Sequence, residues 1–332
     1  MIYQDFSCPK CGHKDFQKDG RDKKTRKRMY VCKHCKSKSN EDNLTGSPQI
    51  VGVTASERTD FKRDILPYLK MIGKKATEKN IVESSQVINM PNRPFAIALL
   101  SDIHGGGKTD YEKLESDLEI IRATEDMYVG NLGDNTDNFV VSKLQSIQRE
   151  QPTTFDMEFR FLEWLIDMVK DSLVFWVSGN HDNWTKKVSG FDFIRHSLSN
   201  VPCLYDPHEI RFTLKWGDNE QRWMVRHKWR NSSIFNPTHP IEVGWERVGY
   251  NFDVGCGGHT HIATLCREFI REGAKRYAVL LGTYKIRDNF AREIGFAKNY
   301  GSGSGAFVYH PDGRVFWCDD LVTAQRLLNS YR

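Results

Sequence analysis

Residues 94–107 read PFAIALLSDIHGGG, and this stretch suggests how the rest of the chain folds. The unbroken apolar run at 96–100 is typical of a strand buried on both faces, as in a mostly parallel sheet covered by other layers. Asp102 and His104 are two positions apart, so their side chains point the same way as the strand ends. The three glycines that follow allow a sharp turn and leave room for a ligand. A carboxylate and an imidazole at a strand end predict half of a metal site.

Four further strand-like runs also end in side chains that can bind a metal. Asp134 follows 127–132, Asn180 and His181 follow 173–178, His227 follows 222–226, and His259 and His261 follow 254–256. In open α/β sheets ligands bind at the carboxyl ends of strands, so we expect these loops to meet at one point. Glycine precedes the polar residue in three of the loops, which is consistent with tight turns.

Helical and hairpin patterns complete the predicted layers. Apolar residues recur at helical spacing in 111–121 and in 155–169, between the strand-like runs. Runs at 306–310 and 315–317 flank Pro311-Asp312-Gly313, which predicts a late hairpin. The sequence therefore predicts an α/β fold of layered strands and helices.

The motifs DIH, GDNTDN, GNHD, the His227 loop and GHTH follow one another in this order. Over residues 94–332 the chain resembles the calcineurin-like metallophosphoesterase superfamily. The resemblance implies a sandwich of two mixed β-sheets flanked by helices, with two divalent metal ions in the active site. It also implies the ligands: Asp102, His104 and His261 for the first metal, Asn180, His227 and His259 for the second, and Asp134 as the bridge between them.

The same resemblance implies phosphoester hydrolysis by a metal-activated water. Mixed oxygen and nitrogen ligands suit several divalent metals. We expect Mn first, with Fe, Zn or Ni as alternatives. His181 would be the protonated general acid, and Asp137 would orient this imidazole and keep it charged. Protein phosphatases have an arginine after that aspartate, whereas this chain has Asn138. Substrate contacts are therefore expected elsewhere, and Asn183, Trp184, Lys186 and Lys187 are the candidates.

Two Cys-x-x-Cys pairs lie in the N-terminal part of the chain, CPKC at 8–11 and CKHC at 32–35. This spacing predicts a structural zinc site with the thiolates of Cys8, Cys11, Cys32 and Cys35 as ligands. The segment CPKCGH…DG…RKRMYVCKHC resembles the zinc ribbons of insertion-sequence transposases. That resemblance implies contact with DNA, and it suggests a phage or mobile-element origin. The nucleic-acid contacts would come from Lys23, Lys24, Arg26, Lys27, Arg28 and Tyr30.

The charge of the chain is concentrated in this segment. The whole chain of 332 residues has a net charge of +5, and residues 1–45 contain twelve Lys and Arg against six Asp and Glu. This imbalance predicts a polyanionic partner for the segment, with DNA favoured. No apolar run is long enough to span a bilayer and no signal peptide is evident, so we expect no membrane partner and a cytoplasmic protein, in the host cytoplasm if phage-encoded.

We therefore expect a zinc ribbon at 1–45, a linker with a short helix and strand at 46–93, and a catalytic domain at 94–332. The predicted function is a DNA-processing nuclease that hydrolyses phosphodiesters with two metals. One alternative is a phosphomonoesterase or small-nucleotide phosphodiesterase whose ribbon docks a protein. Another, of a different class, is a non-catalytic DNA-binding factor.

Overall fold

The computed structural model describes residues 7–40, 66–67, 69–71, 86–230, 233, 235–286 and 302–332. The chain divides into two compact units, Met1–Val82 and Glu83–Arg332, which are described separately. Residues 66, 67 and 69–71 are helical, within the segment predicted to contain a short helix. The three-part division at residues 45 and 93 stays a prediction.

The N-terminal unit contains a small antiparallel sheet with the strand order β1-β2-β3. The strands are β1 (Phe16–Arg21), β2 (Arg28–Cys32) and β3 (Lys38–Asn40). Few of their side chains are buried, and Cys8 and Cys32 are the buried hydrophobic residues of this described segment. A unit with so little apolar burial depends on another source of stability, such as a bound metal.

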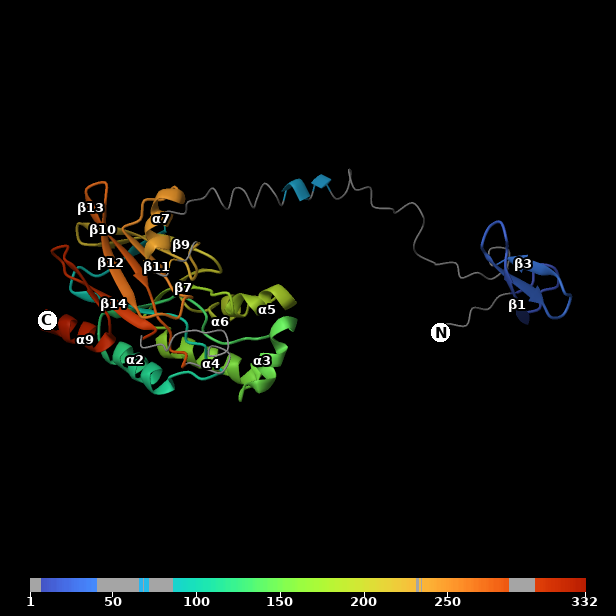
Figure 1. The fold of residues 1–332 in the computed structure, drawn as a ribbon, viewed down its shortest axis with the longest axis horizontal. Helices are drawn as coiled ribbons and strands as arrows, with labels where there is room; N and C mark the ends of the chain where they lie inside the picture. Colours follow the sequence, from blue (N-terminus) through green and yellow to red (C-terminus); the bar gives the residue numbers. More distant parts are fainter. Residues whose placement is uncertain are drawn as a thin grey trace. The chain divides into compact units, whose positions relative to one another are not determined.

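The second unit is a sandwich of two six-stranded mixed sheets (Figure 1). The first sheet has the order β15-β14-β5-β6-β7-β8, with β5 (Phe95–Leu100), β6 (Met127–Asn131), β7 (Leu173–Val177), β8 (Leu204–Asp206), β14 (Ser304–Tyr309) and β15 (Val315–Cys318). The second has the order β12-β13-β11-β10-β9-β4, with β4 (Gln86–Asn89), β9 (Ile210–Trp216), β10 (Asn219–Val225), β11 (Val254–Gly257), β12 (Leu265–Arg271) and β13 (Ala274–Leu280).

Helices flank the two sheets. They are α2 (Tyr111–Ala123), α3 (Gln145–Glu150), α4 (Phe155–Val169), α5 (Asp182–Ser189), α6 (Phe193–Ser197), α7 (His239–Arg247), α9 (Leu321–Ser330) and the 3₁₀ helix Ser142–Leu144. Apolar residues of α2, α4 and α9 pack against the first sheet, and α7 packs against the second. Asp110, Thr154 and Asp320 cap α2, α4 and α9 with their side chains, which explains where these helices begin.

The opening apolar strand, β5, is buried on both faces, as its sequence predicts. Phe95, Ile97 and Leu99 face the second sheet and join the core between the sheets. The alternate residues Ala96 and Leu100 face the helices and belong to the outer core. The small side chain of Ala96 allows the helices to pack closely against the strand. β5 therefore lies in the middle of three layers, between the helices and the second sheet.

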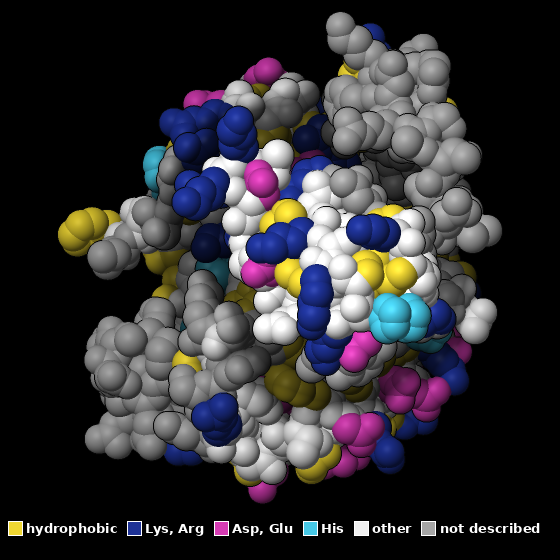
Figure 2. Space-filling view, turned by 90° about the vertical axis from the view of Figure 1, so that its right-hand side faces the viewer, with side chains coloured by type: hydrophobic (Ala, Val, Ile, Leu, Met, Phe, Trp, Pro, Cys, Tyr) yellow, Lys and Arg dark blue, Asp and Glu magenta, His cyan; other side chains and the backbone are white. Residues whose placement is uncertain are grey.

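The predicted fold class is confirmed: the second unit has two mixed sheets flanked by helices. The late hairpin also forms as expected, since β14 pairs antiparallel with β15. A second hairpin forms where β9 pairs antiparallel with β10. The antiparallel pair β12 and β13 was not predicted. None of the helices in the described ranges has the length and apolar character needed to cross a membrane. Lys and Arg side chains form separate groups on the face drawn in Figure 2, with Asp and Glu side chains among them.

Candidate metal centre

Five loops at the carboxyl ends of strands contain the candidate metal ligands. β5, β6 and β7 run parallel in the first sheet, and β10 and β11 run parallel in the second. Asp102 and His104 follow β5, Asp134 follows β6, Asn180 follows β7, His227 follows β10, and His259 and His261 follow β11. Parallel strands end at one edge of a sheet, and stacking the two sheets brings both sets of loops together.

Asp102, His104 and His261 form one group, whose ligand atoms all lie within 4.8 Å of one another. Oδ1 of Asp102 is 3.0 Å from Nε2 of His261, which is itself 3.0 Å from Nε2 of His104. Nδ1 of His104 lies 2.9 Å from the carboxylate of Asp137. A proton on Nδ1 leaves the lone pair of Nε2 directed toward the group, which is the orientation that metal-binding histidines need.

Asp134, His227 and His259 form a second group with the same close spacing. Nε2 of His227 lies 2.9 Å from Oδ2 of Asp134. Nδ1 of His227 lies 2.8 Å from the carbonyl oxygen of Leu132, to which it donates when protonated. This bond fixes the ring tautomer and again leaves the lone pair of Nε2 facing the carboxylate.

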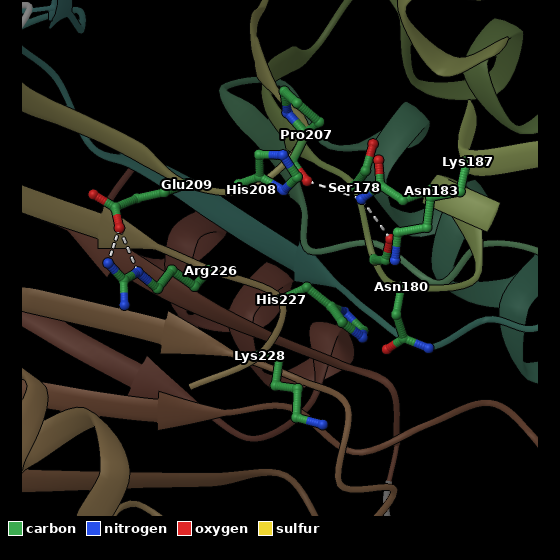
Figure 3. A pocket seen from close by; sticks show the side chains of 11 residues that line it. Ser178, Asn180, Asn183, Lys187, Pro207, His208, Glu209, Arg226, His227 and Lys228 are labelled. Carbon is green, nitrogen blue, oxygen red and sulfur yellow. Dashed lines mark hydrogen bonds and ion pairs between the residues drawn. The ribbon is translucent and has the colours of Figure 1, made fainter. Parts of the chain in front are cut away.

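Asp134 connects the two groups, and Asn180 lies beside the second. Asp134 also belongs to a group with His104 and His181, so its carboxylate is close to residues of both groups. Asn180 and His227 line the same cavity, and their side chains lie next to each other in Figure 3. The structure thus brings the seven predicted ligands to one region of the sandwich.

Three buried polar atoms here have no hydrogen-bond partner among the described residues. They are Oδ1 of Asp102, Oδ1 of Asn180 and Nε2 of His227. The 2.9 Å approach of His227 to Asp134 lacks hydrogen-bond geometry, although the two atoms are close. Leaving such an atom unpaired costs about 1–3 kcal/mol, whereas a bound cation would satisfy it. Carboxylate, amide and imidazole donors without thiolate fit divalent ions such as Mn, Fe, Zn and Ni.

The electrostatics of the centre favour positive charge. Burial raises the pKa of Asp134, but the imidazoles of His227 and His181 outweigh it and keep the pKa of this carboxyl below its usual value. Burial lowers the pKa of His227, yet the carboxylates of Asp134 and Asp102 raise it to about 10. The buried carboxylates therefore favour positive charge at this position, supplied either by a proton on His227 or by a metal ion bound to its deprotonated Nε2.

Five of the seven predicted ligands have left-handed backbone conformations. The φ angles are 50° at Asp102, 54° at His104, 53° at Asp134, 72° at His259 and 52° at His261. Residues other than glycine seldom adopt positive φ, and such strain clusters at functional sites where the surrounding structure maintains it. The turn that each loop makes at the strand end therefore directs several ligands toward one centre.

Two of the glycines in these motifs are required by close approach. A Cβ atom at Gly179 would lie 2.0 Å from Oδ1 of Asp134, and one at Gly258 would lie 2.3 Å from Oδ2 of Asp102. In each case the glycine lies against the carboxylate of an aspartate that follows a different strand. A residue with a side chain would clash with that carboxylate. The backbone NH of His259 also donates to Oδ2 of Asp102 at 2.9 Å, which links the two sheets at the centre.

The expected contact between Asp137 and His181 is wrong in its details. The carboxylate of Asp137 contacts His104 at 2.9 Å and Lys285 at 2.7 Å, and its main-chain carbonyl is 2.6 Å from Nδ1 of His181. Burial lowers the pKa of His181 to about 4, so this imidazole is neutral at neutral pH. The Asp137 carboxylate is paired with His104 instead, because the loop after Asp134 turns the Asp137 side chain toward β5.

Sequence reasoning missed Asp182, the last residue of GNHD. Its carboxylate accepts hydrogen bonds from the backbone NH groups of Asp134 at 2.8 Å, Gly179 at 2.9 Å and Asn135 at 3.1 Å. Burial, followed by the charge of Asp134, raises the pKa of Asp182 to about 6. Asp182 thus ties the loop after β6 to the loop after β7. The sequence feature that could have identified Asp182 is its position directly after Asn180 and His181.

Lys285 and Glu158 were also missed. Lys285 follows β13, far from the motifs in sequence, and no local pattern indicated that its ammonium group contacts Asp137. Glu158 on α4 is 1% exposed and accepts a hydrogen bond of 2.7 Å from the backbone NH of Asn138. Burial raises its pKa to about 7. Only the packing of α4 against the loop after β6 places this carboxyl near the centre.

The four N-terminal cysteines come together as predicted. Sγ of Cys8 lies 3.6 Å from Sγ of Cys35, and Sγ of Cys11 lies 3.6 Å from Sγ of Cys32. A tetrahedral zinc ion with Zn–S bonds of about 2.3 Å separates its sulfur ligands by about 3.8 Å, so the group fits zinc. The Ser37 hydroxyl contacts the thiols of Cys8 and Cys35 at 3.3 Å and 3.0 Å.

Residues 95–263 match the family described as calcineurin-like phosphoesterase. No curated protein matches the chain. A solved protein of unknown function from Aquifex aeolicus is 18% identical over 54% of this chain and 82% of its own, with a TM-score of 0.29. The structure titled as GAP50, the anchor in the inner membrane complex of Plasmodium, is 10% identical over 72% of this chain and 95% of its own, with a TM-score of 0.31. Neither likeness is close enough to support an argument. The family match covers half of the chain and contains all seven candidate ligands, and the chain therefore belongs to the calcineurin-like phosphoesterase family.

Proposed function

We propose that this metal-dependent phosphoester hydrolase is a nucleic-acid phosphodiesterase, with DNA as the favoured substrate. The observation that supports it best is the presence in one chain of the phosphoesterase centre and a four-cysteine unit with an exposed basic hairpin. Nucleic acid is the phosphodiester that a basic binding unit would attract. A phage or mobile-element origin fits this proposal through the resemblance of the ribbon to those of transposases.

The proposed ligand sets follow the two groups. Asp102, His104 and His261 would hold one divalent ion, Asn180, His227 and His259 a second, and Asp134 would contact both. Divalent ions bound there, with Mn the first expectation, lower the pKa of water and stabilise negative charge on a phosphoryl group. The protein contributes preorganisation, since Asp137 orients the His104 ring and the Leu132 carbonyl orients that of His227.

His181 is the proposed proton donor to the leaving oxygen. With the Asp137 carbonyl 2.6 Å from Nδ1, the other nitrogen, Nε2, is the one available for proton transfer. A bound phosphoester brings negative charge to this neutral ring, which favours its protonation. Trp184 and Phe139 pack beside the imidazole, with ring centroids at 4.0 Å and 5.6 Å, and limit its orientation.

The ribbon is the proposed nucleic-acid contact. Residues 23–27 lie between β1 and β2, Arg28 is the first residue of β2, and all six are exposed. Oδ1 of Asp22 accepts hydrogen bonds from the backbone NH groups of Lys24 at 3.0 Å and Thr25 at 2.7 Å. This ordered turn presents Lys23, Lys24 and Arg26 at one tip, where phosphate contacts would be independent of sequence. Lys27, Arg28 and the half-buried Tyr30 extend the proposed contact.

The test is incubation of the full chain with labelled single- and double-stranded DNA and RNA in Mn²⁺. We expect cleavage that Asp134→Asn abolishes and that Asp171→Asn, a change at an exposed aspartate after α4, leaves intact. Asparagine tolerates the left-handed backbone at position 134, so the substitution tests the carboxylate rather than the turn. Hydrolysis of p-nitrophenyl phosphate without cleavage of any nucleic acid would overturn the proposal in favour of a phosphomonoesterase.

Ribbon variants test the delivery of nucleic acid separately. Replacing Lys23, Lys24 and Arg26 by alanine should weaken DNA binding and lower the slope of log K against log salt by about 2–3, since each phosphate contact contributes about 0.9. Binding and its salt dependence are measured by fluorescence anisotropy. An unchanged slope would show that the ribbon does not contact the phosphates.

A further inference from the structure

The cavity beside Asn180 and His227 extends the centre in one direction. It has a volume of about 360 Å³ and is lined from both sheets, by the loop after β7 and α5 on one side and the loop after β10 on the other. This volume is near the lower end of the range of about 300–1,000 Å³ typical of small-molecule sites. His227 is 3% exposed, and its Nε2, which has no hydrogen-bond partner among the described residues, borders this cavity. The cavity is therefore continuous with the candidate metal centre.

The basic side chains that line the cavity differ in whether they have an ion-pair partner. Arg226 is bound to Glu209, which also contacts Arg211, so this guanidinium already has a carboxylate partner. Lys187 on α5 and Lys228 after β10 also line the cavity, and in the described part of the chain neither has an ion pair. Both are exposed. Figure 3 shows them on different segments, with Asn180 and His227 between them in this view.

The neighbours of Lys187 narrow the choice of substrate contacts. The Lys186 ammonium binds the Asp192 carboxylate at 2.9 Å, which satisfies its charge. Nδ2 of Asn183 donates to the carbonyl oxygens of Gly179 at 2.8 Å and Pro207 at 2.9 Å, so this side chain supports the cavity wall. Of the four residues expected to contact substrate after GNHD, Lys187 is the one that lines the cavity with a charge that has no ion pair among the described residues.

We propose that Lys187 and Lys228 form a subsite for a second phosphate group of the substrate, next to the phosphoryl group at the metal centre. The two ammonium groups lie on opposite sides of a cavity that opens from the centre, and neither is paired within the described ranges. They would bind a dianion through charge and without reading a base. This inference rests on the proposed function and deepens it, because it selects substrates with neighbouring phosphates over isolated phosphoesters.

Binding to the Mn²⁺-loaded full chain tests the subsite without turnover. Isothermal titration calorimetry compares thymidine 3′,5′-bisphosphate with thymidine 3′-monophosphate and thymidine 5′-monophosphate. We expect the bisphosphate to bind about tenfold more tightly than either monophosphate. In the double variant Lys187→Gln/Lys228→Gln this preference should disappear, leaving the three affinities about equal, since each exposed ion pair contributes a factor of about three and the two together account for about ninefold.

Lys186→Gln is the matched control, because it removes a charge from the same helix but not from the cavity. It should keep the tenfold preference. Equal affinities in the unaltered protein, or a preference that persists in the double variant or is lost equally in the control, would overturn the subsite. Failure of the proposed function gives a different result: no nucleic acid is cleaved, while the preference for the bisphosphate and its loss in the double variant remain.

Discussion

At the scale of single residues, the candidate metal centre depends on more than its ligands. It also depends on buried carboxylates that form hydrogen bonds to the loops containing those ligands. Asp182 accepts three backbone hydrogen bonds and lies 8% exposed beneath the candidate centre. Asp137 orients His104, and Glu158 supports the backbone of Asn138. These buried carboxyls keep the ligand loops in place, and each can be tested by substitution.

We predict that Asp182→Ala lowers the free energy of unfolding by about 2–4 kcal/mol, because it leaves three buried NH groups without an acceptor. Asp182→Asn keeps one acceptor oxygen and should cost less. Urea unfolding of the metal-free protein measures both changes without a contribution from ligand binding. An alanine variant as stable as the original would mean that water replaces the carboxylate at these NH groups.

At the scale of elements, the turn between α2 and β6 connects distant parts of the catalytic unit. Asp126 has a φ of 55°, and its carboxylate binds Nε and Nη2 of Arg93 at 2.7 Å and 2.8 Å. The hydrogen bond with Arg93 is the main cause that lowers the pKa of Asp126. The bond ties this turn to the residues just before β5, which anchors the start of the strand that leads into the centre.

The lowered pKa of Asp126 predicts a pH-dependent contribution to stability. Because the folded pKa lies below the unfolded value, the contribution is present above about pH 4 and is lost as the pH falls through the folded value. Asp126→Asn should lower the unfolding free energy by about 0.5–1 kcal/mol at pH 7, since the half-exposed Arg93 is screened by solvent.

Asparagine also tolerates the left-handed conformation at this turn, so the substitution isolates the charge. Thermal unfolding of both proteins from pH 7 down to pH 3 measures the difference, which should shrink as the pH falls. A difference that is the same at every pH would assign the effect to packing.

At the scale of the whole molecule, two units of different physical character belong to one chain. The catalytic unit is held by cores between its sheets and beneath its helices, whereas the ribbon buries little beyond Cys8 and Cys32. Zinc binding should therefore supply much of the folding free energy of the ribbon and little of that of the sandwich.

We predict that removing zinc with a thiolate-competing chelator unfolds the ribbon alone. Amide hydrogen exchange should become fast in β1, β2 and β3 and stay slow in β5, β6 and β7. Cys11→Ser should have the same effect and lower the zinc content by one ion per chain, whereas Cys203→Ser, in the catalytic unit, should change neither. Slow exchange in the zinc-free ribbon would show that its fold does not need the metal.

The sequence was sufficient for the parts of the protein that depend on local order. The alternation of apolar runs with Asp, Asn and His predicted strands that end in ligands, and the spacing of four cysteines predicted their cluster. Both are properties of short segments, in which strand period, turn chemistry and ligand type are encoded by adjacent residues.

The tertiary structure decided which side chains meet across the ends of those segments. Only the stacking of two sheets places His227 against Asp134 and brings Lys228 to the same cavity as Lys187. The path of the loop after β6 turns Asp137 toward His104 rather than His181. Such contacts depend on loop paths and left-handed turns that are stable only when the surrounding packing maintains them. Local patterns therefore identified the candidate ligands, while the partners that orient them and the two lysines of the proposed phosphate subsite come together through packing between distant segments.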